Sequence, residues 1–188
     1  MNTRSKTNCE VARLRIGMVG MGMIFDETYR PFLETAARDG VFDPSLGRIG
    51  VTLSAVASRT GVRAETYRGN APAGNAEFAS YAEPKAIDQL LNTDVDLVCI
   101  ATPDDRHFEA ARAAIDAGKH VLIEKPSVLS LAELDLLEDL AQQRGVLAKI
   151  VYHKLFDPDH KKLRTLVVDG VLRHVNSGYC TLLEPKQI

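Results

Sequence analysis

The chain has 188 residues, of which 45% are hydrophobic and 26% charged, and its formal net charge is −2. This composition is typical of a globular protein with room for one ordinary domain and a further piece. The small negative charge gives no electrostatic reason to expect nucleic acid or an anionic membrane as a partner, and no apolar run approaches the roughly 20 residues of a membrane helix.

Apolar segments of strand length alternate with segments of helical pattern along most of the chain, which is typical of βαβ units and a parallel sheet. The predicted strands are Leu14–Val19, Val51–Ala57, a weak one at Phe78–Tyr81, Val95–Ala101, Val121–Ile123 and Val146–His153. The predicted helices begin near Met23, with a kink or restart at Pro31, and continue with Thr60–Tyr67, Pro84–Leu91, Asp105–Ala117, Leu131–Gln143 and Pro158–Val168. The sequence therefore predicts an α/β protein with a Rossmann-type doubly wound parallel sheet.

Local signals refine these boundaries. Arg38–Gly50 is rich in turn residues and is predicted to be a surface loop. Ser130 and Glu133 form a capping box for the helix that follows, and Gly118 is a suitable C′ residue for the helix before it. Val171–Leu183 is predicted to be β-like.

A phosphate-binding turn is predicted directly after the first strand, in G-M-G-M-I-F. Gly20 and Gly22 permit a tight turn and a close approach of the backbone to a pyrophosphate, and the amides of Met23 and Ile24 open the next helix. The third position, normally Gly or Ala, is Phe25, so either the helix stands further from the strand or the motif adjusts locally. The alternative interpretation is an ordinary strand–turn–helix.

The end of the second strand carries the residues that choose the cofactor. NAD-binding folds place a carboxylate there, whereas NADP sites use Arg and small hydroxyl residues. This chain has Ser58, Arg59 and Thr60, and the nearest following carboxylate is Glu65. A guanidinium is a forked, permanently charged donor to phosphate. The pattern favours NADP, with NAD as the second choice and an ordinary polar turn as the alternative.

A lysine follows the strand Val121–Ile123, in the sequence Glu124, Lys125, Pro126. Ligands of an open parallel sheet bind outside the carboxyl ends of its strands, so Lys125 is a candidate for chemistry. The alternative is a surface lysine. The three cysteines are scattered and without a C-x-x-C pair, which argues against a disulfide framework or a metal site and indicates reduced thiols in the cytoplasm.

Taken together, these motifs resemble the glucose-fructose oxidoreductase/inositol dehydrogenase (Gfo/Idh/MocA) family. The matching elements are G-M-V-G-M-G at 17–22, D-V-D-L-V-C-I-A-T-P at 94–103, His107, A-G-K-H-V-L-I-E-K-P at 117–126 and F-D-P at 156–158. They span most of residues 13 to 170 in the order and spacing of the family's N-terminal domain. Asp104 replaces the family's usual Asn, and Leu155 stands where relatives commonly carry Arg.

The resemblance implies roles for individual residues. Ala101, Thr102 and Pro103 would line the cofactor, and His107 matches the histidine of the family's cofactor-binding pattern. The resemblance also implies that the Lys125–Pro126 bond is cis.

At the other end of the cofactor, the resemblance places Glu124 and Lys125 by the nicotinamide. Lys125 would be the catalytic residue that contacts the reacting hydroxyl or carbonyl group. No metal ligand set is implied.

The same resemblance shapes the expected domains and function. We expect a disordered tail over residues 1–12, an NAD(P)-binding Rossmann domain over 13–153, and over 154–188 a connecting helix and the truncated start of a second α+β substrate domain. The family's D-x-x-x-H pair would belong to that second domain.

The expected function is hydride transfer between NADP(H) and a sugar- or polyol-like substrate. The alternative is a free-standing nucleotide-binding module, inactive alone, that pairs with another subunit. Assembly into a homo-oligomer is left open.

Overall fold

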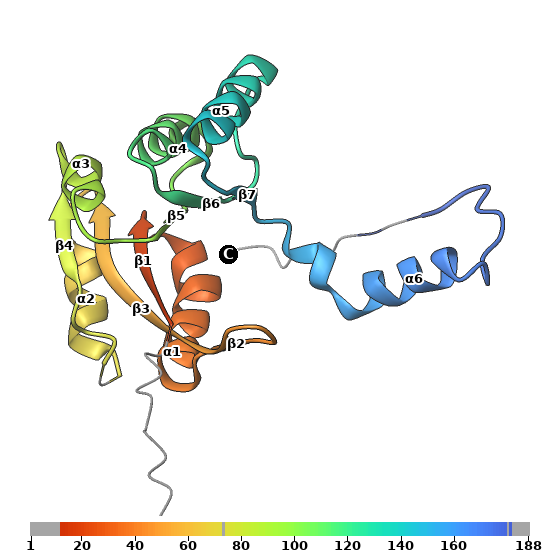
Figure 1. Ribbon diagram of the computed structural model, residues 1–188, viewed down its shortest axis with the longest axis horizontal. Coiled ribbons are helices and arrows are strands. Elements are labelled where there is room, and N and C mark those ends of the chain that lie inside the picture. The colour runs from red at the N-terminus through yellow and green to blue at the C-terminus, as the bar shows by residue number, and fades with distance from the viewer. Residues whose placement is uncertain (1–11, 73, 180, 182–188) are drawn as a thin grey trace, which may run out of the picture. The chain divides into compact units, whose positions relative to one another are not determined.

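The computed structural model describes residues 12–72, 74–179 and 181 (Figure 1). Its strands are β1 (Arg13–Val19), β2 (Val41–Asp43), β3 (Gly47–Ser58), β4 (Ala79–Ala82), β5 (Leu97–Ile100), β6 (His120–Ile123) and β7 (Ala148–Ile150). Its helices are η1 (Phe25–Tyr29), α1 (Arg30–Asp39), α2 (Val62–Asn70), α3 (Ala86–Leu91), η2 (Asp104–Arg106), α4 (His107–Asp116), α5 (Leu131–Arg144), η3 (His153–Phe156) and α6 (Pro158–Val168). The chain divides into two compact units, the first ending at Val151 and the second beginning at Tyr152.

The parallel strands of the first unit have the order of a Rossmann sheet. β1 pairs with β3 on one side and β5 on the other, β4 extends the β3 side, and β6 and β7 extend the β5 side. The strand order therefore reverses at β1 and β5, where such sheets bind ligands outside the carboxyl ends of the strands. The predicted fold class is confirmed.

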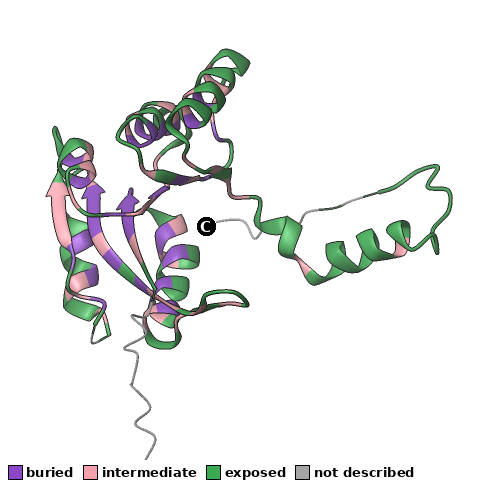
Figure 2. Cartoon of the chain, in the orientation of Figure 1, coloured by how far each residue is buried: buried purple, intermediate pink, exposed green. Residues whose placement is uncertain are grey.

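Helices cover both faces of this sheet because its strands are apolar on both sides. One hydrophobic cluster packs α3, α4 and α5 against the sheet, and the other packs η1, α1 and α2 against the opposite face. Figure 2 shows the result, with buried strands between helices whose outer faces are exposed. The predicted strand–helix alternation is therefore the consequence of a sheet buried on two sides.

A one-residue bulge in β3 changes which face its side chains meet. β1 pairs Ile16 with Leu53 and Gly17 with Ala55, so Ser54 is left without a partner in the register. Leu53 accordingly packs in the cluster around α1 and α2, whereas Ala55 packs in the cluster around α3 and α4. Without the extra residue, alternation would put both side chains on one face.

One prediction of local structure, just after the first helix, needs correction. The segment Arg38–Gly50, predicted as a loop, contains β2 and the start of β3, which pair antiparallel as a hairpin. Its turn is closed by Asp43, whose Oδ1 accepts hydrogen bonds from the amides of Ser45 and Leu46 at 2.8 and 3.0 Å. The turn predicted from these residues is present, but the antiparallel pairing of the short segments on either side of it was not predicted.

The predicted strand Val146–His153 is also shorter than expected. Only Ala148–Ile150 pairs with β6, and His153 already begins the 3₁₀ helix η3. In the second unit, Asp157 caps α6 by accepting from the amides of residues 159 and 160 at 3.0 and 3.3 Å. The helix predicted over Pro158–Val168 is confirmed.

The two chain ends carry further predictions. Residues 171–179 and 181 form no strand, contrary to the β-like segment predicted there, and the described part of the second unit offers no other strand with which they could pair. The rest of that segment, and the predicted disordered tail apart from Ala12, lie outside the described residues. No helix in the described part of the chain combines the length and the apolar character needed to cross a membrane.

Candidate functional site

A cleft of about 990 Å³ lies outside the carboxyl ends of β1, β3 and β5. It is the place at which a doubly wound sheet binds its ligand. The predicted site residues that line it are Gly20, Gly22, Met23, Ile24, Ser58, Arg59, Thr60, Ala101, Thr102 and Pro103. His107, Glu124 and Lys125 are not in its lining. The fold thus brings the glycine turn, the basic turn after β3 and the turn after β5 to one cleft.

Gly20 is required by the protein itself. Its φ is +93°, and a Cβ built on it would lie 2.4 Å from the carbonyl oxygen of Ala101. The amide of Gly20 donates to the carbonyl oxygen of Ala57 at 2.9 Å, which ties the turn to the end of β3. A side chain here would push two strand ends apart, so only glycine fits.

Gly22 differs, because no atom of the described residues lies within 4 Å of a Cβ built on it. The turn continues into η1, where the amide of Phe25 donates to the carbonyl oxygen of Gly22 at 3.1 Å. Phe25 itself is buried and packs edge-on against Tyr67 of α2, with ring centroids 5.2 Å apart. The unusual third position of the motif is therefore accommodated by a local adjustment, a π-helical turn that directs Phe25 toward α2.

The turn after β3 is held by Ser58, whose Oγ accepts a hydrogen bond from the amide of Gly61 at 3.1 Å. Its own proton remains free to be donated. Arg59 and Thr60 are exposed on the cleft, and within the described residues the Arg59 side chain has no hydrogen bond or ion pair. Glu65, the nearest carboxylate in sequence, pairs with Arg68 and does not line the cleft. Beside this turn Glu83 also lines the cleft, and its amide donates to the carbonyl oxygen of Ser58 at 3.2 Å.

Thr102 supplies an unpartnered group at the end of β5. Its Oγ1 is buried and has no hydrogen-bond partner in the part of the chain that the structure describes. A buried hydroxyl without a partner is costly, so a ligand that accepts or donates a hydrogen bond there would be stabilised. Together with the open position at Gly22, this orphaned hydroxyl fits a dinucleotide lying across the strand ends.

His107 lies behind the cleft and is almost fully buried. Its Nδ1 lies 2.7 Å from the carbonyl oxygen of Pro126, and its Nε2 lies 2.9 Å from that of Thr102. The imidazole therefore bridges the loops that follow β5 and β6. His107 therefore connects the turn after β5, which lines the cleft, with the loop after β6, which carries Lys125.

The loop after β6 carries a buried carboxylate and an exposed lysine. Glu124 is 7% exposed, and its Oε1 accepts a hydrogen bond from the phenol of Tyr29 at 2.9 Å. Burial, and secondarily the nearby Cys99 and Glu124, raise the pKa of Tyr29, so the phenol keeps its proton and remains a donor. Lys125 is exposed, and its peptide bond to Pro126 is cis, as predicted.

Tyr29 was not found from the sequence. It lies 95 residues from Glu124, and nothing in the helical pattern around it distinguishes it from a core residue. Cys99 was likewise unassigned. It is buried without a disulfide, and burial, followed by the charge of Glu124, raises its pKa to about 12. Tyr29 thus holds the buried carboxylate by a hydrogen bond, and Cys99 lies near enough to be affected by its charge.

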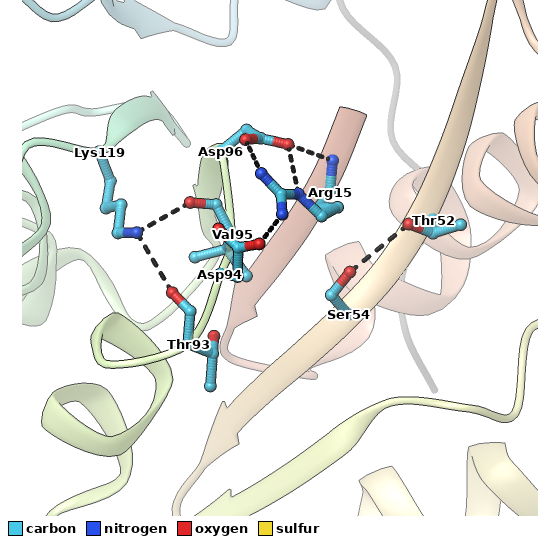
Figure 3. A network of polar contacts seen from close by, with 8 residues as sticks. All are labelled: Arg15, Thr52, Ser54, Thr93, Asp94, Val95, Asp96 and Lys119. Carbon is cyan, nitrogen blue, oxygen red and sulfur yellow. Dashed lines mark hydrogen bonds and ion pairs between the residues drawn. The ribbon is translucent and has the colours of Figure 1, made fainter. Parts of the chain in front are cut away.

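Lys119, the other lysine of the motif at 117–126, lies at the opposite end of β6 from Lys125. Lys119 Nζ donates to the carbonyl oxygens of Thr93 and Val95 at 3.2 and 3.0 Å (Figure 3). Beside it, Arg15 Nη2 and Asp96 Oδ1 form an ion pair of 2.7 Å, and the arginine hydrogen bonds hold the pKa of Asp96 below its usual range. This network joins the beginnings of β1, β5 and β6, at the end of the sheet opposite the cleft.

The single D-x-x-x-H string of the chain lies at that same end. Asp116, at the end of α4, pairs with Arg144, and His120 Nδ1 accepts a hydrogen bond from the amide of Leu147 at 2.9 Å. Both side chains thus have structural partners. Among the described residues, no group of three or more His, Cys, Asp or Glu side chains is arranged to hold a metal ion.

Charged residues that the sequence analysis did not single out also line the cleft. Arg106 pairs with Glu83 at 3.0 Å, which joins the turn after β4 to η2. Arg63, in the first turn of α2, pairs with Asp26 of η1. Their signal in the sequence was only their position shortly after a predicted strand end.

A Rossmann sheet with a glycine turn at its switch point defines a dinucleotide-binding domain. Residues 14–153 match the family described as GFO_IDH_MocA, the oxidoreductase family with an NAD-binding Rossmann fold. The chain belongs to this family, and the resemblance expected from its motifs is confirmed. Family membership supports the binding of NAD(P).

Several relatives are similar to this chain over its N-terminal part. The uncharacterized oxidoreductase YdgJ of Escherichia coli is 36% identical over 94 residues, which is 50% of this chain and 27% of that protein. The scyllo-inositol 2-dehydrogenase (NADP(+)) IolW of Bacillus subtilis is 34% identical over 83 residues, or 44% of this chain and 23% of that protein.

Among solved structures, KijD10, a 3-ketoreductase from Actinomadura kijaniata in complex with NADP and TDP-benzene, has a TM-score of 0.66 and 28% identity. The match covers 85% of this chain and 43% of that one. The matched regions thus amount to less than half the length of each of these relatives.

Proposed function

We propose that this chain is the NADP(H)-binding half of an oxidoreductase that transfers hydride between the nicotinamide and a sugar- or polyol-like substrate. The observation that carries the proposal is the convergence of three features in one cleft. These features are the open approach at Gly22, the unpaired guanidinium of Arg59 and the buried hydroxyl of Thr102. Each suits a different part of a dinucleotide, and they lie on three neighbouring strand ends.

In this proposal the pyrophosphate lies against the glycine turn. Gly22 lets the backbone approach the phosphates, and the amides of Met23 and Ile24 donate hydrogen bonds to them. Ala101, Thr102 and Pro103 then line the nucleotide from the β5 side. His107 keeps that side in place through its two carbonyl contacts.

The phosphate on the ribose 2′-oxygen selects NADP in this proposal. Arg59 binds it as a charged donor, and the hydroxyls of Ser58 and Thr60 add hydrogen bonds. The carboxylate nearest to this turn in the cleft lining, that of Glu83, is paired with Arg106, whereas Arg59 has no such partner among the described residues, and this difference supports the choice of NADP. The relative IolW is named for NADP(+), and KijD10 was solved with NADP.

The substrate end of the site is proposed at the loop after β6. When bound, the nicotinamide supplies the hydride acceptor or donor. Lys125 gives or takes the proton of the reacting oxygen at Nζ, and Glu124, held by Tyr29, fixes the loop from which the lysine extends. Sugar- and polyol-like substrates are proposed because relatives are named inositol and UDP-N-acetylglucosamine dehydrogenases.

Fluorescence titration with NADPH and NADH tests the cofactor. NADPH should bind more tightly, and Arg59→Asp should narrow or reverse the preference, since a charge-assisted phosphate contact is worth about 1.5–3 kcal/mol, or roughly tenfold to a hundredfold. Arg164→Asp makes the same charge change on an exposed face of α6 and should alter neither affinity. Equal affinities for both cofactors would refute the choice of NADP.

Turnover separates the enzyme from the alternative, a nucleotide-binding module that pairs with another subunit. The family's D-x-x-x-H pair is expected on a second domain, so the enzyme predicts substrate-dependent reduction of NADP⁺ with a sugar or polyol when these residues are joined to such a domain. In that joined protein, Lys125→Ala should lower the rate by about 10²–10⁴ while leaving NADPH affinity within about twofold. If the joined protein bound NADPH but turned over no such substrate, the module would be favoured.

A further inference from the structure

One ion pair joins the glycine turn to the turn after β3. Arg63, at the start of α2, donates from Nη2 to Oδ2 of Asp26, at the start of η1. The two residues are 37 positions apart, and of the two only Arg63 lines the cleft. Their side chains are 57% and 43% exposed, so both remain accessible to a ligand and to solvent.

The charges around this pair do not balance. Asp26 is also faced by Arg30, whose Nε lies 3.9 Å from Oδ1 and whose Nη2 donates to the Asp26 carbonyl oxygen at 3.3 Å. Two guanidinium groups, those of Arg63 and Arg30, therefore face one carboxylate. This local surplus favours an anion, and Asp26 would keep Arg30 as a partner if Arg63 turned away.

Arg63 is placed to serve the same ligand group as Arg59. Both line the cleft, and they lie four positions apart on either side of Gly61, whose φ of +75° turns the chain into α2. A phosphate monoester carries about −1.5 to −2 charges at neutral pH, compared with one on a carboxylate. It can therefore compete with Asp26 for the guanidinium.

We propose that Arg63 is a second determinant of NADP(H) specificity and that Asp26 competes with the 2′-phosphate for it. This inference rests on the proposed function. In the free protein Arg63 pairs with Asp26, and on binding it exchanges the carboxylate for the 2′-phosphate. Asp26 thereby lowers the affinity for the phosphorylated cofactor, and it has no such effect on a cofactor that lacks the phosphate.

This competition is measured with a double-mutant cycle of Arg63→Gln and Asp26→Asn, in which each variant is titrated with NADPH and with NADH to determine its affinity. Arg63→Gln should weaken NADPH binding about tenfold and leave NADH within about twofold. Asp26→Asn should tighten NADPH about two- to fivefold, the range of an exposed ion pair. In the Arg63→Gln background, Asp26→Asn should change nothing further.

Two matched controls remove a charge from comparable exposed ion pairs. Glu65→Gln acts on α2 itself, where Glu65 pairs with Arg68, and Arg144→Gln acts on the pair with Asp116. Neither should alter the affinity for either cofactor. Thermal unfolding of each variant checks that the fold is intact, since all these side chains are at the surface.

The outcomes separate this inference from the function on which it rests. If the unmodified chain bound neither cofactor, or bound both equally, the proposed choice of NADP and this inference would both fall. If it preferred NADPH but Arg63→Gln had no effect, only the inference would fall. If Asp26→Asn tightened NADPH equally without Arg63, Asp26 would act through its general charge, and the competition would be refuted.

Discussion

Replacing Gly20 with alanine tests how the two central strand ends meet. The new methyl carbon would lie 2.4 Å from the carbonyl oxygen of Ala101 and 2.7 Å from its carbonyl carbon. These atoms belong to the backbone at the end of β5, so they cannot move aside as a flexible side chain would. The backbone φ of +93° is allowed for glycine but would strain an alanine at this position.

The cost follows from these two effects. A left-handed backbone costs a non-glycine residue about 1–2 kcal/mol, and overpacking costs about 1–3 kcal/mol. Gly20→Ala should therefore lower the free energy of unfolding by about 2–5 kcal/mol. For a chain of this size that corresponds to a fall of roughly 4–20 °C in melting temperature.

Gly22→Ala is the matched variant, two residues away in the same turn. Because no atom of the described residues lies near its Cβ position, we expect the free energy of unfolding to change by less than about 0.5 kcal/mol. Its effect should instead fall on NADPH, with affinity reduced about tenfold or more, since the methyl would occupy the approach of the pyrophosphate.

Urea unfolding and NADPH titration of both variants measure these effects. The expected pattern is a stability defect in Gly20→Ala and a binding defect at normal stability in Gly22→Ala. If Gly20→Ala were as stable as the original chain, the contact between the ends of β1 and β5 would be wrong. If Gly22→Ala bound NADPH normally, the pyrophosphate would not lie on this turn.

Three further predictions follow from the buried and charged contacts. Tyr29→Phe leaves the buried carboxylate of Glu124 without its donor, so urea unfolding should show a loss of about 1–3 kcal/mol; a change below about 0.5 kcal/mol would contradict this. An imidazole with one N–H donates to one of the two carbonyl oxygens beside its nitrogens, so His107→Leu leaves that carbonyl unpaired and should cost about 1–3 kcal/mol, with normal stability as the contrary result. Hydrogen bonds from Arg15 lower the pKa of Asp96 in the folded protein. Ionised Asp96 therefore stabilises the fold at pH values above about 3.9, the pKa of an Asp in the unfolded chain, and this stabilisation is lost as the pH falls through the lower pKa of the folded state. Asp96→Asn should therefore flatten the acid side of the stability–pH profile, and an unchanged profile would refute the assignment.

Much of the fold was predictable because its signals are local. Strands buried on both faces are apolar throughout, and helix ends carry their own chemistry. The capping box at Ser130 and Glu133 and the C-cap glycine Gly145 are both present. By contrast, β2 was missed because a three-residue strand is defined by its pairing with β3, and the bulge at Ser54 appears only in the register with β1.

The candidate site divides in the same way. Gly20, Gly22 and Arg59 were predicted because each closely follows a predicted strand, and all three line the cleft, whereas Lys125, predicted on the same ground, lies outside its lining. Tyr29 was missed because its partner lies on a distant strand end, and its sequence context is that of an ordinary helix.

The sequence by itself therefore determined the alternation of strands and helices, the glycine turn and the family to which the chain belongs. These follow from backbone preferences and hydrophobic patterns that act within a few residues. Only the tertiary structure decided that His107 joins two loops, that Tyr29 supports Glu124, and that Arg63 of α2 pairs with Asp26 of η1. Contacts of this kind depend on which strand ends the sheet order makes neighbours, and no local pattern encodes that order.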